Sequence, residues 1–355
     1  MTDVHALMDA CFEQAASDLH LAVGRPPVLR VQGHLVELEG GPLTPEDTAA
    51  MAQSILPERC QRELAECGST DYGYSHQDKC RFRVAVLTQK GSVGIVMRLI
   101  PHKLLSFEQI GLPETVQDLL TLQRGLVLVT GPTGSGKTTT LASMVDWINE
   151  HRDVHIITIE DPVEYYHAHR KAMVTQREVG TDTTSFGEAM RRALREDPDV
   201  ILLGEMRDLE TTSAAISAAE TGHLVFGTLH TTGSARTVDR IIDQYPTHQQ
   251  EQIRSQLSVA LVAVISQILV PTAGGGGRVA AFEVMIMNPA IENHIRKKET
   301  FKIPSVIQTS RRSGNVLLDD SLMELYRSGR VDKTTLLERA FDRKAVESRL
   351  GGGGD

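Results

Sequence analysis

One short stretch constrains the fold of this chain more than any other. Residues 125–140 read GLVLVTGPTGSGKTTT, which is an apolar run, a glycine-rich turn and the start of a helical pattern. The stretch fits G-x-x-x-x-G-K-[ST], with Gly131, Gly136, Lys137 and Thr138 at the fixed positions. Glycines let successive backbone N–H groups face a phosphate at the N-terminus of the following helix. The stretch therefore predicts a strand–loop–helix unit that binds a nucleoside triphosphate.

The region around this loop alternates apolar runs with helical patterns. GLVLVTG, VHIITIED, DVILLGE and HLVFGTLH are continuous apolar runs with helices between them. Such runs are typical of parallel strands that helices cover on both faces. We therefore expect an α/β core whose strand ends meet at one edge, where ligands of such sheets bind.

The sequence pattern divides the chain into five parts. Residues 1–100 predict a small α+β domain, in which CRFRVAVLTQ and SVGIVMRLI form antiparallel strands joined near Gly91. Residues 101–113 carry proline at both ends and suit a linker, and residues 114–288 form the α/β core. Residues 289–350 have polar helical patterns and predict a C-terminal helical subdomain. The final GGGGD, residues 351–355, predicts a flexible tail.

The glycine-rich loop supplies the predicted phosphate site. Lys137 would place its charge on the β- and γ-phosphates, and Thr138 would offer its hydroxyl to Mg²⁺. The residues expected to surround ATP are Gly131, Pro132, Thr133, Gly134, Ser135, Gly136, Lys137, Thr138 and Thr139.

A loop of this kind needs an acidic partner near the metal, and Glu205 is the first candidate. It follows the apolar residues 200–203 and Gly204, where an aspartate at the strand end is more usual. A glutamate there can hold a metal-bound water or polarise the attacking water, so Glu205 is also a candidate metal ligand. A charged strand end with no catalytic role is the alternative.

Residues 157–167, ITIEDPVEYYH, place Glu160, Asp161 and Glu164 around Pro162 at the end of another predicted strand. Carboxylates repel phosphate, so acids belong at this edge only where Mg²⁺ and a nucleophilic water are handled. Asp161 with Pro162 equally suits a turn.

Two histidines bracket the strand in GHLVFGTLHTT. His230 follows the carboxyl end and is placed to sense or bond the γ-phosphate, whereas His223 precedes the strand. The two rings cannot lie side by side on an extended chain of that length.

Arg81, Arg83 and Arg98 are candidate cations from the first hundred residues. Arg81 and Arg83 alternate along a strand and point to one face, for which a solvated face is the simpler interpretation.

Composition narrows the classes of function. The net charge is −9, which disfavours a general nucleic-acid binder, since that would need a basic face. No apolar run approaches a membrane-spanning length, and the N-terminus lacks the basic start of a signal peptide. The four cysteines form no C-x-x-C pair, which disfavours a zinc site.

Taken together, these motifs resemble the secretion ATPase superfamily. GPTGSGKTTT, ITIEDPVE, ALREDPDVILLGEMRD and TGHLVFGTLHTT are similar to its Walker A, Asp-box, Walker B and His-box segments. ASDLHL and CRFRVAV are similar to its N-terminal domain, and the resemblance within the family is greatest to the ATPases that retract type IV pili.

The resemblance implies a PAS-like N-terminal domain, a RecA-like ATPase domain and a homohexamer that hydrolyses ATP with Mg²⁺. It implies that Glu205 and Glu164 are catalytic acids, that His223 and His230 are the His-box pair, and that Arg81, Arg83 and Arg98 face phosphate or a subunit interface. It also implies a cytoplasmic protein peripherally associated with the inner membrane at the pilus base. The expected partners are an inner-membrane platform protein and a paralogous retraction ATPase, with no nucleic acid.

One motif departs from the family pattern. The retraction ATPases carry A-I-R-N-L-I-R-E, whereas residues 290–299 read AIENHIRKKE, with Glu292 and His294 in place of Arg and Leu. This change touches coupling to the pilus rather than the ATPase chemistry.

Three alternatives remain at the level of sequence. Pilus-extension and type II secretion ATPases usually carry a tetracysteine zinc insert and a longer N-terminal region, and this sequence has neither. A RecA-like nucleic-acid translocase would need a basic, aromatic-rich strip. A scaffold that binds nucleotide without turnover is disfavoured by the presence of Lys137 and Glu205.

Overall fold

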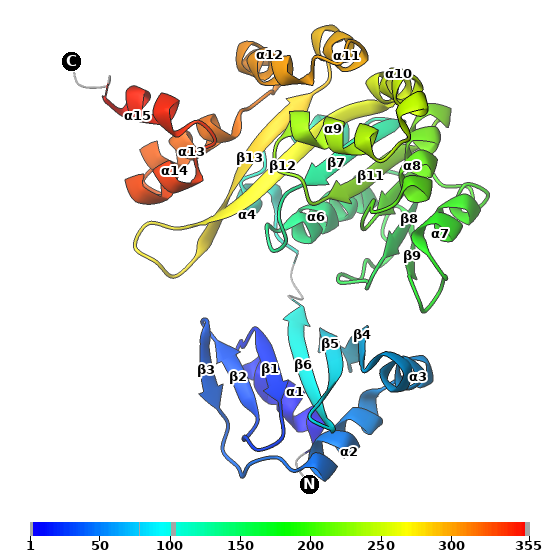
Figure 1. The fold of residues 1–355 in the computed structure, drawn as a ribbon, viewed down its shortest axis with the longest axis vertical. Helices are drawn as coiled ribbons and strands as arrows, with labels where there is room; N and C mark the ends of the chain where they lie inside the picture. Colours follow the sequence, from blue (N-terminus) through cyan, green and yellow to red (C-terminus); the bar gives the residue numbers. More distant parts are fainter. Residues whose placement is uncertain (1–2, 78, 101–103, 352–355) are drawn as a thin grey trace. The chain divides into compact units, whose positions relative to one another are not determined.

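The computed structural model describes residues 3–77, 79–100 and 104–351 and consists of two compact units. The N-terminal unit is formed by residues 1–103 and 162–166, and the large unit by residues 104–161 and 167–355. Figure 1 shows the elements of both. Residues 101–103 of the expected linker and residues 352–355 of the expected tail lie outside the described residues.

The N-terminal unit is an antiparallel sheet with helices packed on it. Its described strands form a six-stranded sheet in the order β3-β2-β1-β6-β5-β4. Leu19, Phe82, Val84 and Met97 lie in its core, and Phe82 and Val84 are alternate positions of one strand, which point to the same face. The elements are α1 (Val4–Glu13), β1 (Asp18–Leu21), β2 (Val28–Val31), β3 (His34–Glu37), α2 (Pro45–Ile55), α3 (Glu58–Cys67), β4 (Ser69–His76), β5 (Cys80–Gln89) and β6 (Ser92–Ile100).

The segment 162–166 belongs to the N-terminal unit although it follows β8 in the chain. Arg81, which is 7% exposed, donates from Nε to the Val163 carbonyl at 2.7 Å and from Nη1 to Ser75 Oγ at 2.9 Å. The same guanidinium bonds the Tyr166 hydroxyl and lies over its ring. Arg81 therefore fixes this segment on the N-terminal unit.

The large unit is built on a mostly parallel sheet. In the described residues its strand order is β13-β12-β7-β11-β10-β8-β9, with β12 and β13 antiparallel and the other pairs parallel. The strands are β7 (Gly125–Thr130), β8 (His155–Glu160), β9 (Met173–Glu178), β10 (Val200–Leu203), β11 (Leu224–Leu229), β12 (Leu261–Pro271) and β13 (Arg278–Ile286). The expected parallel runs are confirmed, and residues 274–277 lie in the β12–β13 hairpin connection.

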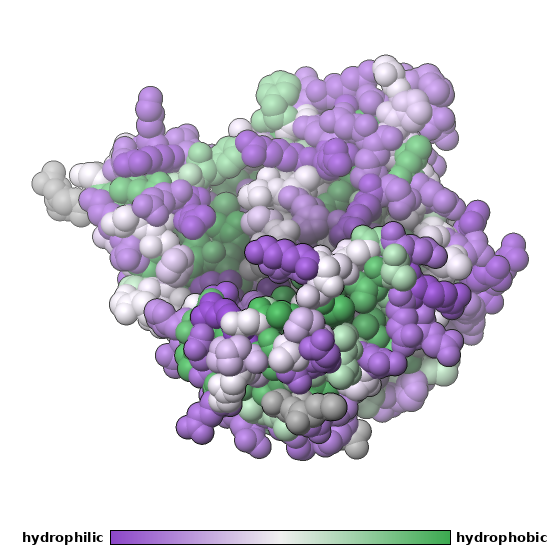
Figure 2. All heavy atoms as spheres, turned by 60° about the horizontal axis from the view of Figure 1, so that its bottom comes forward, coloured by the Kyte–Doolittle hydropathy of each residue, from purple (hydrophilic) through white to green (hydrophobic). Residues whose placement is uncertain are grey.

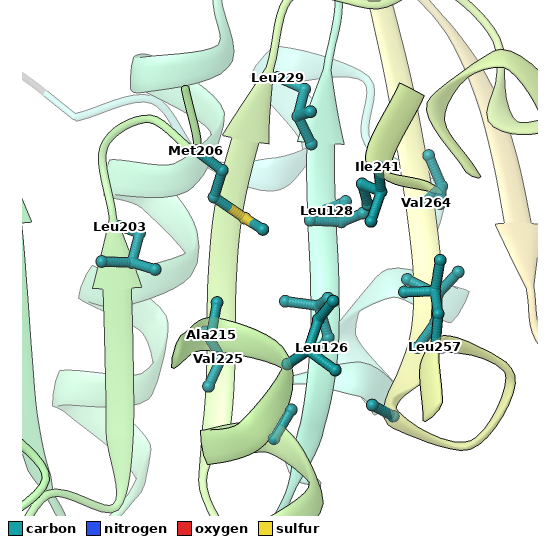
Figure 3. Packing of buried hydrophobic residues seen from close by; sticks show 14 of the residues in the cluster. Leu126, Leu128, Leu203, Met206, Ala215, Val225, Leu229, Ile241, Leu257 and Val264 are labelled. Atoms are coloured by element: carbon teal, nitrogen blue, oxygen red, sulfur yellow. The ribbon is translucent and has the colours of Figure 1, made fainter. Parts of the chain in front are cut away.

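Helices cover both faces of this sheet, because its central strands are apolar on both sides. One core holds Leu126 and Leu128 of β7 with Val225 of β11, and in Figure 3 these side chains stand beside Met206, Ile241 and Leu257. The opposite face packs Val127, Val129 and Phe226 against α6. The larger helices here are α6 (Lys137–His151), α7 (Phe186–Ala193), α8 (Leu209–Thr221), α9 (Ser234–Asp243) and α10 (Gln250–Ala260).

Residues 104–113 of the expected linker contain the short helix α4 (Phe107–Ile110) and belong to the large unit, followed by α5 (Thr115–Leu119). Phe107, Ile110 and Leu112 are buried there, since their side chains join the core on the α6 face. The helical pattern after Pro289 gives α11 (Pro289–Arg296), α12 (Ile303–Thr309), α13 (Leu318–Arg327), α14 (Lys333–Arg339) and α15 (Arg343–Gly351).

The surface is mixed in polarity. On the face drawn in Figure 2, hydrophilic residues surround smaller areas of hydrophobic ones. Val259, Phe301 and Phe341 of the large unit are each more than two thirds exposed. None of the helices in the described part of the chain combines the length and apolar character that crossing a membrane requires.

Candidate active site

The glycine-rich loop joins β7 to α6 and packs against the neighbouring strand β12. Gly131 has φ 144°, and a Cβ built on it would lie 2.1 Å from the Gln267 carbonyl oxygen. Gly136 has φ 89°, and its Cβ would lie 2.9 Å from Gln267 Nε2. Thr140 Oγ1 donates to Gln267 Oε1 at 2.7 Å, which holds that side chain in place. Both glycines are thus required by backbone conformation and by space.

Lys137 is the first residue of α6, and its side chain folds back over the loop. Its Nζ donates to the Gly131 carbonyl at 2.9 Å and to the Pro132 carbonyl at 3.2 Å, and the residue is 9% exposed. Burial lowers the pKa of Lys137, and the nearby charge of Glu205 opposes that shift. The Lys137 ammonium therefore lies at the glycine-rich loop, where the sequence predicted a phosphate site.

Glu205 lies just beyond β10 with both oxygens engaged. Its Oε1 lies 3.0 Å from His230 Nε2, and its Oε2 lies 2.7 Å from Arg207 Nη2. Burial raises the pKa of this carboxyl, but the hydrogen bond and charge of Arg207, with His230 and Lys137, outweigh burial and hold the pKa below its ordinary value. Glu205 is therefore an ionised carboxylate at neutral pH.

His230 connects Glu205 to Lys137. It follows β11, whose Leu229 pairs in register with Thr130 of β7, so the ring lies beside the start of the loop. Its Nδ1 is 3.4 Å from Lys137 Nζ. A protonated lysine only donates, so Nδ1 accepts and Nε2 carries the proton that it donates to Glu205. This assignment makes the ring a hydrogen-bond bridge between a cation and a carboxylate.

The acids after β8 lie beside the same edge. Leu203 of β10 pairs in register with Ile159, which brings Gly204 against the backbone of Glu160. Glu160 Oε1 accepts a hydrogen bond from Thr158 Oγ1 at 2.6 Å, so one of its carboxylate oxygens is hydrogen-bonded within its own strand. Asp161 contributes to a raised pKa of Arg207, after the larger effect of Glu205.

Other predicted residues are placed elsewhere. His223 precedes β11 and bonds the Ala218 carbonyl at 3.1 Å through Nδ1, so the whole strand separates it from His230. Glu164 lies in the segment 162–166 of the N-terminal unit, and its catalytic role stays a prediction.

The candidate arginines also belong to the N-terminal unit. Arg81 is committed to the contacts described above, and Arg83 is exposed on the same strand. Arg98 donates to Asp18 Oδ1 at 3.0 Å. Their predicted roles at phosphate or at an interface stay predictions.

Two residues of the site were missed from the sequence. Arg207 lies two positions after Glu205, and an extended segment puts residues i and i+2 on one side, which was an available signal. Gln267 comes from β12, about 130 positions from the loop, and no local pattern marks it.

The residues at this edge fit a phosphate group and a metal that the phosphate helps to bind. Ser135 Oγ is buried in the loop and has no hydrogen-bond partner among the described residues. No cluster of three or more His, Cys, Asp or Glu side chains able to hold a metal occurs in the described part of the chain. Mg²⁺ is commonly bound by one or two protein groups together with substrate phosphates, and Thr138 and Glu205 could supply those groups.

Comparison with known proteins assigns the chain to a family. The family model described as "Type II/IV secretion system protein" matches residues 73–275, which is more than half of the chain. The chain belongs to this family.

The relatives of this secretion-system chain include named pilus proteins. The type IV pilus retraction ATPase PilT of Pseudomonas aeruginosa is 46% identical over 95% of this chain and 98% of its own length. A twitching motility protein of Neisseria gonorrhoeae is 45% identical over 90% of this chain and 86% of its own length. A crystal structure of the pilus retraction motor PilT with bound ADP aligns with a TM-score of 0.91 at 46% identity, over 98% of this chain and all of that one. The expected fold class, an N-terminal domain followed by a RecA-like ATPase domain, is confirmed by this match.

Proposed function

We propose that this chain is an ATP hydrolase that powers the retraction of type IV pili. The observation that carries the proposal is the Lys137–His230–Glu205 arrangement beside the glycine-rich loop. Support comes from full-length similarity to a retraction ATPase and to a twitching motility protein. The division into a RecA-like core at 114–288 and a helical subdomain at 289–350 is part of the same proposal.

The residues would act on ATP as follows. Lys137 moves from the loop carbonyls to the β- and γ-phosphates, because an anion is a stronger partner than a carbonyl. Thr138 and Glu205 would hold Mg²⁺, which would neutralise charge on the phosphates. Glu205 orients the attacking water and takes its proton, and His230 keeps one Glu205 oxygen fixed.

Assembly and location are proposed at a finer level than the comparisons reach. We place the chain in a cytoplasmic homohexamer at the inner-membrane base of the pilus, acting on a platform protein beside a paralogous ATPase. Exposed apolar side chains such as Phe301 and Phe341 are of the kind that subunit interfaces cover. Light scattering with and without ATP tests the hexamer. An Arg83→Ala variant with lower turnover and an unchanged hexamer supports an interface role for that arginine.

The altered motif in α11 has a local structural explanation. Glu292 lies 3.6 Å from Arg296, and His294 Nδ1 lies 3.1 Å from Glu299. Both substituted residues thus have a partner on the helix or next to it, and none of the described active-site contacts involves them. Coupling to the pilus is the property that these two positions would change.

The decisive experiment is complementation of a piliated strain that cannot retract. Wild type restores twitching, and Lys137→Ala does not, although both are made in equal amounts. Purified wild type releases phosphate from ATP, and Lys137→Ala does not. A wild type that hydrolyses ATP only when nucleic acid is added, or that binds ATP without cleaving it, contradicts the proposal.

A further inference from the structure

The segment that carries Glu205 is fixed at Met206. The Met206 N–H donates to the Thr228 carbonyl at 3.0 Å, and its side chain is 2% exposed. Figure 3 shows this side chain in the core beside β11. A Cβ at Gly227 would lie 2.3 Å from the Met206 sulfur, so β11 needs a glycine there. Met206 thereby anchors the backbone between Glu205 and Arg207.

The same segment is also fixed on either side of this pair. The Gly204 N–H donates to the Ile159 carbonyl at 2.8 Å. Asp208 caps α8, since its Oδ1 accepts from the Thr211 N–H at 2.7 Å. Arg207 therefore extends from a backbone that is held on both sides, so its pairing with Glu205 has to order only the side chain.

The Arg207 guanidinium has little to do with stability. Its side chain is 69% exposed, and ion pairs in solvent contribute little to folding. Glu205, by contrast, is 17% exposed. The pair is thus asymmetric: the exposed arginine loses little solvation, whereas the enclosed carboxylate gains a fixed partner.

Two fixed oxygens define the plane of a carboxylate, and one does not. His230 holds Oε1, and Arg207 holds Oε2. We propose that Arg207 is a positioning residue, which keeps the Glu205 carboxylate in the orientation in which it receives the attacking water. This inference rests on the proposed ATP hydrolysis.

The charged and titratable groups around Glu205 come from three further elements. Lys137 comes from α6, His230 follows β11, Glu160 ends β8 and Asp161 follows it. Arg207 lies 2.7 Å from Glu205 Oε2 through its Nη2, so removing the guanidinium leaves that oxygen without the contact that fixes the plane of the carboxylate.

The test is ATP hydrolysis by full-length Arg207→Ala as a function of ATP concentration. We expect kcat to fall about 10- to 100-fold, as when an orienting partner of a catalytic group is lost. KM should change less than about twofold, because Arg207 does not bind the nucleotide. Arg207→Lys keeps the positive charge but loses the planar fork of the guanidinium, so it should restore kcat only in part.

Arg343→Ala is the matched control. Arg343 is 63% exposed and pairs with Glu347 at 2.8 Å on α15, so it repeats the exposed Arg–Glu pair without an active-site partner. This variant should keep the kcat and KM of the wild type. Both alanine variants should keep the wild-type melting temperature, which excludes misfolding as the cause of lost activity.

Three outcomes would overturn the inference. One is a raised KM with unchanged kcat, which would mean that Arg207 touches the nucleotide. Another is an Arg207→Ala variant in which both kcat and KM are unchanged. The third is a further loss when Arg207→Ala is added to Glu205→Gln in single-turnover assays, since a residue acting through Glu205 has no effect once that carboxylate is gone. A wild type without ATPase activity fails the proposed function instead, so the two failures are distinguishable.

Discussion

The two sheets of this chain use their polar residues in different ways. In the N-terminal unit each strand runs antiparallel to its neighbours, and charges pair across strands: Asp18 and Arg98 are partners in register on β1 and β6. In the large unit β7, β11, β10 and β8 are parallel, and Lys137, His230 and Glu205 follow the ends of three of them. Strand direction thus decides whether polar side chains spread along a sheet or gather at one edge.

The largest effect is expected for Glu205→Gln, at the edge where the polar residues of the large sheet gather. The amide keeps the shape but cannot accept a proton, so kcat should fall about 10²- to 10⁴-fold. Phosphate release from ATP measures the change, and circular dichroism checks the fold. Glu347→Gln, in an exposed ion pair on α15, should keep full activity. A Glu205→Gln enzyme within a factor of two of wild type would remove the carboxylate from the mechanism.

Gly131→Ala should cause the largest loss of stability in the loop. Its Cβ would meet a backbone oxygen at 2.1 Å, and φ is 144°. We expect the free energy of unfolding to fall by about 2–3 kcal/mol, as for overpacking combined with backbone strain. Gly134→Ala is the control, because φ is 77° but no atom lies within 4 Å. Gly134→Ala should lower the free energy of unfolding, measured with urea, by about 1 kcal/mol. Equal losses in Gly131→Ala and Gly134→Ala would contradict the steric argument.

In the N-terminal unit, Arg98→Ala should have a modest effect that depends on pH. Burial raises the Asp18 pKa, but hydrogen bonds from Ser17 and Arg98 and the charge of Arg98 bring it below its ordinary value. Because the pKa of Asp18 is lower in the folded chain than in the unfolded chain, the ionised carboxylate stabilises the fold at pH values above the unfolded pKa. This contribution is lost as the pH falls through the folded pKa.

Arg98 is 70% exposed, so screening limits the expected cost of Arg98→Ala to about 1 kcal/mol at neutral pH. Urea unfolding at several pH values measures it. The difference between wild type and variant should vanish at a pH below the folded pKa of Asp18. A difference that persists there would show that packing, not charge, is lost.

The smallest effect is expected for Arg83→Ala. Arg83 pairs in register with Arg98 but is exposed on β5, so its loss should change the free energy of unfolding by no more than about 0.5 kcal/mol. Thermal unfolding of Arg83→Ala should be compared with that of Arg81→Ala. Arg81→Ala should lose more stability, because Arg81 is buried and hydrogen-bonded to Val163 and Ser75. An equal loss from both would mean that exposure does not set the cost in this sheet.

The sequence predicted the edge of the large sheet because its strands are apolar runs ending in polar residues. Lys137, Glu205 and His230 were placed by that rule, and the structure brings them together. This rule did not predict strand β9, because this edge strand reads MVTQRE and has no apolar run. The Arg207–Glu205 contact depends on side-chain direction, which a spacing of two residues suggests but does not establish.

The segment 162–166 could not be assigned from the sequence. ITIEDPVEYYH reads as one strand end, yet residues 162–166 belong with a sheet whose last strand ended some sixty positions earlier. Its position depends on Arg81, a contact between residues 82 positions apart. Local propensity carries no information about such a pair.

The chain crosses between its two units three times, after residues 103, 161 and 166. A truncation that stops at residue 103 would therefore omit Val163 and Tyr166 and leave the Arg81 guanidinium without two of its partners. Anyone cloning the N-terminal unit alone would need to graft the pentapeptide 162–166 onto it, or accept a fragment with an incomplete surface.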